Sequence, residues 1–97
     1  MQKQQMKRAL KKISKPVKKE LFKEVGFTDE EILLMQYLYI DRINQPWVSD
    51  ELGISLPTLT KLHNTCIEHI ISFYNFEKYK HDHNEYNCFD KYFADIE

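Results

Sequence analysis

The sequence of 97 residues has few glycines, prolines and cysteines, and it lacks any long apolar run. Two glycines and three prolines supply too few turns for a β-sandwich or β-barrel of many strands. No apolar segment approaches the roughly 18–20 residues of a membrane span, and none follows the basic N-terminus as a signal-peptide core would. Two cysteines without CxxC or zinc-finger spacing form no disulfide framework, so we expect free thiols in the reducing cytoplasm.

What the chain does contain is typical of a small globular protein. It is 42% hydrophobic and 30% charged, with a net charge of -1, whereas a disordered chain combines low hydrophobicity with high net charge. Its length is that of one domain. Together with the scarcity of turn residues, this composition predicts an all-α fold, a small helical domain of about five or six helices.

The charges are distributed very unevenly along the chain. Residues 1–23 carry a net charge of +8, and residues 24–97 carry a net charge of -9. We interpret residues 1–26 as a basic helical N-terminal arm, which fits contact with nucleic acid. Two alternatives stay open at this point: the lysines form a solvated helix face, or the arm folds back on the acidic part of the chain.

Capping signals predict where the helices begin and end. Thr28 and Glu31 have the spacing of a capping box, and Gly26 and Gly53 are suited to end helices in the left-handed conformation. Residues 81–84 are polar and predict a loop. The predicted helices span residues 2–14, 16–25, 29–42, 46–52, 56–79 and 88–96. We therefore divide the chain into the basic arm (1–26), a helix-turn-helix domain (27–80) and an acidic aromatic C-terminal helix (81–97).

Residues 45–64 have the layout of a helix-turn-helix. Ser49 is small enough for two helices to cross closely, Gly53 tolerates the positive φ of the turn, and Ile54 fills the corner. The residues expected to be buried together are Trp47, Val48, Leu52, Ile54, Leu59 and Leu62. Those expected to point outward, toward a DNA major groove, are Ser55, Leu56, Pro57, Thr60, Lys61 and Asn64. The alternative is an αα-corner without a role in DNA binding.

The outward residues offer little charge. Lys61 and Asn64 are able to bond base edges, whereas Leu56 and Pro57 offer only apolar contact to thymine methyl groups. Affinity for DNA phosphates would then come from the basic arm. The arm residues predicted to bind DNA are Lys7, Arg8, Lys11 and Lys12.

Residues 27–70 resemble the region-four domain of bacterial sigma factors and their phage relatives, the RinA/ArpU-type late transcription regulators. The matching positions are Leu33, Leu38, Tyr39, Trp47, Val48, Leu52, Gly53, Ile54, Ser55, Leu59 and Leu62. The resemblance covers a little under half of the chain. It implies a transcription regulator encoded by a phage or mobile element, in which Ser55, Thr58, Thr60 and Lys61 contact double-stranded DNA.

A second class of function stays open. The acidic and aromatic C-terminal half suits a small interaction protein that inhibits a host nucleic-acid machine, such as RNA polymerase or a CRISPR nuclease. An apolar face in this segment must be buried on the chain's own core or on a second copy, as a homodimer. That face consists of Phe89, Tyr92, Phe93 and Ile96.

Signals for catalysis or metal binding are weak. His81, His83 and Cys88 are three potential metal ligands, but their spacing matches no closed zinc site. His63 and His69 are interpreted as surface residues, and Cys66 as a small buried hydrophobe. No phosphate loop, nucleophile elbow or carboxylate pair is present, so we predict no enzyme, no metal and no cofactor.

Overall fold

The computed structural model describes residues 1–94, and within them it consists of helices and connecting segments without a strand. The predicted all-α fold is therefore confirmed. In chain order the helices are α1 (Lys3–Lys12), α2 (Lys15–Val25), α3 (Asp29–Met35), the π-helix η1 (Gln36–Ile40), α4 (Gln45–Leu52), α5 (Leu56–Asp82) and α6 (Phe89–Phe93).

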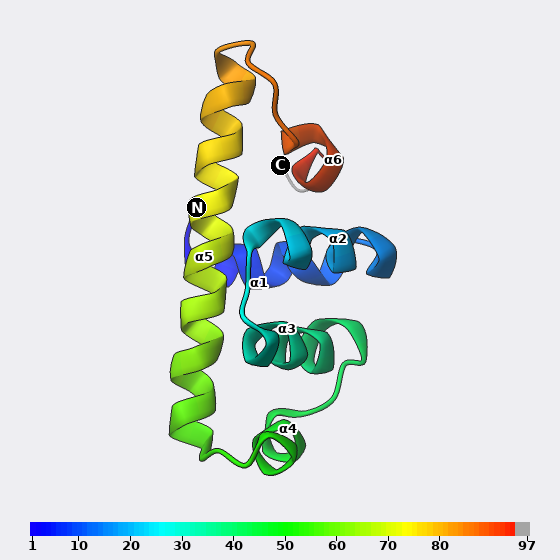
Figure 1. Cartoon of the computed structure of the whole chain (residues 1–97), viewed down its shortest axis with the longest axis vertical. Coiled ribbons are helices and arrows are strands. Elements are labelled where there is room, and N and C mark those ends of the chain that lie inside the picture. The colour runs from blue at the N-terminus through cyan, green and yellow to red at the C-terminus, as the bar shows by residue number, and fades with distance from the viewer. Residues whose placement is uncertain (95–97) are drawn as a thin grey trace.

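The longest helix, α5, organises the fold. Its 27 residues extend about 40 Å at 1.5 Å per residue, which accounts for most of the 45 Å long dimension of the molecule. The other helices lie one after another along α5 and run across its direction (Figure 1). α4 lies beside the start of α5, α6 lies beside its distal half, and α1 crosses its middle.

One hydrophobic core joins the three segments into which the sequence was divided. α1 contributes Met6 and Leu10, α5 contributes Ile67 and Ile70, and α6 contributes Phe93, all of them fully buried. The basic segment is helical, as predicted, but α1 is a packed helix of the domain and not an arm that extends from it. Phe89, Tyr92 and Phe93 are buried on the chain's own core, so these three residues of the predicted apolar face are covered without a second copy.

Local capping chemistry sets several helix boundaries as predicted. The Thr28 hydroxyl accepts from the Glu31 backbone N–H at 3.3 Å, and the Glu31 carboxylate accepts from the Thr28 N–H at 2.9 Å. Gly26 and Gly53 end α2 and α4 with φ values of 83° and 68°, a region that residues with a Cβ atom rarely adopt. These contacts involve near neighbours in the sequence, which is why the pattern reveals them.

The other ends of the helices differ from the prediction. The helix that begins at Asp29 changes to π-helical hydrogen bonding at Gln36, so that Asp41 N–H donates to the Gln36 carbonyl, and Arg42 follows in the left-handed region with a φ of 54°. The prediction of a loop at residues 81–84 is wrong for its first half, because no proline or glycine interrupts α5 before Asp82. α6 is shorter than the predicted helix 88–96, and Ile96 lies outside the described residues.

The helix-turn-helix segment has a smaller buried centre than predicted. Val48, Ser49 and Leu59 are buried, whereas Leu52, Ile54 and Leu62 are half-buried. The prediction that Trp47 is buried with them is wrong, because 45% of its surface is exposed. Its ring lies at the surface, edge-on to Tyr37 with 5.5 Å between the ring centroids.

Candidate nucleic-acid interface

The start of α5 presents a short exposed surface. Ser55 caps the helix, because its hydroxyl accepts from the Thr58 N–H at 3.3 Å and also donates to the Thr58 hydroxyl at 2.9 Å. These two hydroxyls are therefore engaged with one another. The predicted contact residues that are exposed here are Ser55, Leu56, Pro57, Thr58, Thr60 and Lys61.

Asn64 differs from the other predicted contact residues. It is half-buried, and its side-chain oxygen accepts from the Lys7 ammonium at 3.3 Å. The prediction that Asn64 points outward is therefore only partly right. Lys7, also half-buried, is brought by α1 to a point one helical turn beyond Thr60 on the same side of α5. The contact joins two groups of residues that the sequence analysis placed in separate segments.

The cations of α1 form a positively charged surface. α1 contains five lysines and arginines and no acidic residue. Lys3 forms an ion pair with Glu68 of α5 at 2.7 Å and thereby lowers the pKa of that carboxyl. The remaining four cations, Lys7, Arg8, Lys11 and Lys12, form no ion pair with a carboxylate within residues 1–94. Folding back on the acidic body thus accounts for one cation of α1 and leaves four available.

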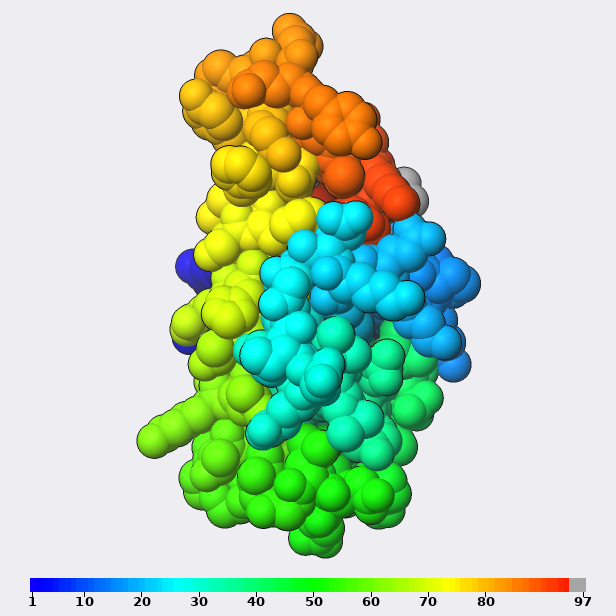
Figure 2. Space-filling model, viewed as in Figure 1, coloured from blue at the N-terminus to red at the C-terminus, as the bar shows by residue number. Residues whose placement is uncertain are grey.

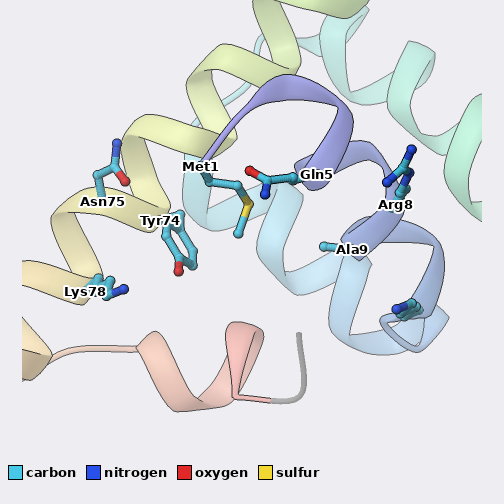
Figure 3. Close-up of a pocket in the computed structure, with 8 residues that line it drawn as sticks. Met1, Gln5, Arg8, Ala9, Tyr74, Asn75 and Lys78 are labelled. Atoms are coloured by element: carbon cyan, nitrogen blue, oxygen red, sulfur yellow. The ribbon is translucent and has the colours of Figure 1, made fainter. Parts of the chain in front are cut away.

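Two hollows flank α1. The first, of about 500 Å³, lies between α1 and the distal half of α5 and has Arg8 and Lys12 on the α1 side and Asn75 on the α5 side (Figure 3). The second, of about 460 Å³, lies on the other side of α1, toward the start of α4. No carboxylate of the described residues lines either hollow. The space-filling view of Figure 2 shows the opposite side of the molecule, where almost nothing of α1 is visible.

The second hollow has a buried polar pair in its wall. The Tyr39 hydroxyl of η1 lies 2.7 Å from His63 Nε2 of α5, and both residues are buried. Burial lowers the pKa of His63 to about 4, and the Lys7 ammonium acts in the same direction. Burial also raises the pKa of Tyr39, so both groups are neutral at pH 7. The interpretation of His63 as a surface residue is therefore wrong, whereas His69 is exposed as predicted.

A buried lysine of α2, Lys18, contacts the end of η1. The Lys18 ammonium donates to the Tyr39 backbone carbonyl at 2.6 Å, at the C-terminal end of η1, where the helix dipole favours a cation. Burial lowers the pKa of Lys18, and the nearby charges of Arg42 and Lys15 add to this shift. The Arg42 guanidinium in turn donates to the Lys11 carbonyl at the end of α1, at 3.2 Å. These two cations stabilise helix ends and hold α1, α2 and η1 together.

Two charged side chains of the C-terminal half, Glu77 and Lys91, make contacts within the fold. Glu77 is buried, and its carboxylate accepts from the Cys88 N–H at 2.8 Å, which fastens the returning chain to α5. Glu20 of α2 forms an ion pair with Lys91 of α6 at 2.7 Å. Three aromatic residues are nevertheless exposed near the distal end of α5: Phe76, Tyr79 and Tyr86.

The histidines and cysteine considered as metal ligands do not converge. His83 stacks on Tyr79, with 4.1 Å between the ring centroids, and His81 lies 3.4 Å from the Asp90 carboxylate. Within residues 1–94, no three His, Cys, Asp or Glu side chains gather in a way that would hold a metal ion. None of the described helices is both long enough and apolar enough to span a membrane. α5 has 27 residues, but it is not apolar enough.

Comparisons with protein-family models, curated proteins and solved structures gave no match to this chain. The resemblance to sigma region four accordingly stays a prediction based on the sequence pattern. The interface is therefore defined by its own residues, the exposed start of α5 and the cationic α1.

The burial of two polar residues of this region, His63 and Lys18, was not predicted from the sequence. A readable signal existed for His63, since it follows Leu59 by four positions and precedes Cys66 by three, on the apolar face of α5. Lys18 likewise precedes Leu21 and Phe22 by three and four positions, on the buried face of α2. In both cases the apolar periodicity predicts burial even though the residue type suggests the surface.

Proposed function

We propose that this protein is a DNA-binding transcription regulator, encoded by a phage or another mobile element and active in the cytoplasm. The exposed start of α5 reads bases in the major groove, and the cations of α1 bind phosphates of the backbone. One observation carries the proposal: four cations of α1 have no carboxylate partner in residues 1–94, and one of them, Lys7, bonds to Asn64, one helical turn beyond the exposed Thr60 of α5. The two free cysteines are compatible with a reducing compartment.

The location of the charge matters more than its sum. The chain as a whole has a net charge of only -1, which by itself would not attract a polyanion. α1, however, concentrates its positive charge on one rigid helix whose apolar side is packed against α5. A fixed array of cations neutralises phosphates with less loss of conformational freedom than a flexible tail would incur.

A pair of matched variants tests the proposal. Arg8, Lys11 and Lys12 are exposed on α1, and Lys15, Lys19 and Lys23 are exposed on α2, where Glu20 and Glu24 accompany them. Replacing either set by alanine removes three positive charges. Fluorescence anisotropy with duplex DNA from upstream of the protein's own locus measures the affinity of each variant. We expect the α1 variant to bind at least tenfold more weakly and the α2 variant to bind within about threefold of wild type. Equal losses would contradict the proposal.

A second candidate function is inhibition of a host nucleic-acid machine by direct contact. The exposed Phe76, Tyr79 and Tyr86 favour it, because large aromatic side chains at the surface are typical anchors of protein interfaces. Tyr86 in particular exposes 91% of its surface. The acidic Asp90 lies on the neighbouring α6 and is exposed; Asp95, which belongs to the same acidic segment, lies outside the described residues.

The α1 variant and two variants at the distal end of the molecule, each tested for DNA binding and in a pull-down, separate the two functions. Tyr86→Ser and Asp90→Asn would abolish capture of RNA polymerase in a pull-down if the protein is an inhibitor, and they would leave DNA binding unchanged. If it is a regulator, the α1 variant loses DNA binding and the two distal variants retain it.

A further inference from the structure

The hollow between α1 and the start of α4 combines cations from one helix with amides from another. It has a volume of about 460 Å³ and is bounded by α1, by the end of η1 and the turn that follows, and by α5. Its polar and charged lining residues are Gln4, Lys7, Arg8, Lys11, Asn44 and Gln45. Leu38, Tyr39 and Ile43 form its apolar wall. A smaller hollow of about 150 Å³ adjoins it and adds Arg42 beside Lys11.

We call the larger hollow, of about 460 Å³, the groove. The charged side chains that line it are all cations. Lys7, Arg8 and Lys11 line it, Arg42 borders it, and no carboxylate of the described residues takes part in either hollow. Arg42 is held toward Lys11 by its bond to the Lys11 carbonyl at 3.2 Å. Cations gathered in a concave site without counter-charges repel one another, and a bound anion relieves that repulsion.

The donors available to such an anion are side chains. At the start of α4, Pro46 has no N–H, and the Trp47 N–H already donates to the Asn44 side-chain oxygen at 3.0 Å. The buried Tyr39 hydroxyl and His63 Nε2 hydrogen-bond to each other, and both residues lie in the wall of the groove. An anion in the groove would therefore meet the ammonium and guanidinium groups of α1, with the Gln4 and Gln45 amides beside them.

We propose that this groove is a phosphate-binding site, which holds a backbone phosphate of the bound duplex. The choice of a duplex as the source rests on the proposed function; a free phosphorylated small molecule would offer the same oxyanion. The position favours the duplex, because Lys7 links the groove directly to Asn64 and so to the exposed start of α5. A phosphate fixed here would set the register of that helix on the bases.

Gln4 and Gln5 provide a matched pair of variants. Both are exposed on α1, but Gln4 lines the groove and Gln5 lines the hollow on the other side of the helix. Gln5→Glu keeps the capping box with Gln2, since a carboxylate accepts the Gln2 N–H as the amide oxygen does at 2.8 Å. Each variant adds one negative charge to the same helix, and only Gln4→Glu places it in the groove.

Inorganic pyrophosphate serves as the first probe. In the full-length protein at low salt, we expect it to shift the His63 imidazole resonances saturably, because this ring lines the groove. Gln4→Glu should weaken the binding roughly tenfold, and Gln5→Glu should change it by less than about threefold. Circular dichroism confirms that both variants are folded. The absence of a saturable His63 shift, or equal weakening by the two variants, would overturn the site.

Duplex DNA serves as the second probe and separates the two proposals. The same difference between Gln4→Glu and Gln5→Glu in duplex affinity supports the assignment of a backbone phosphate. If wild type binds the duplex and the two variants are equally impaired, the groove assignment falls and the proposed function stands. If pyrophosphate binds in the groove and no duplex binds, the proposed function and the duplex assignment both fall, and the site belongs to a small phosphorylated ligand.

Discussion

The Lys7 ammonium donates to the side-chain oxygen of Asn64 at 3.3 Å, although the two residues are 57 positions apart in the sequence. This contact fixes the cationic α1 against the outward side of α5. Because α1 also contributes Met6 and Leu10 to the core, removing the first 15 residues would damage the fold together with the charge. Substitutions at exposed positions of α1 are therefore the appropriate test of its charges.

Lys61 is the one cation among the exposed residues at the start of α5. If this helix reads bases, Lys61→Ala should lower the preference for upstream over random DNA by about 1–3 kcal/mol, the value of one base contact. Competition binding with the two duplexes measures this difference. Ser72→Ala, at an exposed position more than two turns further along α5, is the control and should keep the preference. An unchanged preference in Lys61→Ala would argue against base reading by this residue.

Leu59 and Leu56 allow the packing of the same helix to be tested. Leu59 is fully buried and Leu56 is 44% exposed, three residues apart in α5. Leu59→Ala should lower the free energy of unfolding by about 2–5 kcal/mol, because it leaves a cavity in the core. Leu56→Ala should lower it by less than about 1 kcal/mol. Chemical denaturation gives both values, and similar losses would mean that the register of α5 is wrong.

His63 predicts a dependence of stability on pH. Its pKa is about 4 in the folded protein, against 6.5 for an ordinary histidine, so the unfolded chain binds the proton more readily. The contribution of neutral His63 to the free energy of unfolding is complete above pH 6.5, and it is lost as the pH falls toward 4. Between pH 7 and pH 5 it should decrease by about 2 kcal/mol.

The variant His63→Gln isolates this contribution from those of the other histidines. Glutamine keeps a hydrogen-bonding group near the Tyr39 hydroxyl and does not titrate. The decrease in the free energy of unfolding between pH 7 and pH 5 should therefore be about 2 kcal/mol smaller in His63→Gln than in wild type. Identical pH profiles would show that His63 is protonated equally easily in the folded and unfolded states.

The sequence reveals those parts of the fold that depend on near neighbours. The capping box at Thr28 and the glycine at position 53 involve residues a few positions apart, and both were predicted. The outward position of Lys61 follows from helical periodicity, and it was predicted as well. Such features require no knowledge of how the helices pack.

Other features depend on partners that are distant in the sequence. The Tyr39 carbonyl at the end of η1 accepts from Lys18, 21 residues earlier, and no local pattern announces either the π-helix or its partner. Trp47 was expected to be buried with the apolar residues of the helix-turn-helix, yet its ring packs on Tyr37 at the surface. The groove was not predicted either, since it requires α1, η1, α4 and α5 to be placed together.

The dependence of duplex affinity on salt tests the central claim most directly. Wild type and the two triple-alanine variants, Arg8/Lys11/Lys12 of α1 and Lys15/Lys19/Lys23 of α2, are compared at several salt concentrations. Each phosphate contact contributes about 0.9 to the slope of log affinity against log salt. We predict that the slope of the α1 variant is smaller in magnitude by about 2–3 and that the slope of the α2 variant equals that of wild type. An unchanged slope in the α1 variant would contradict the account, because it would mean that these cations neutralise no phosphate.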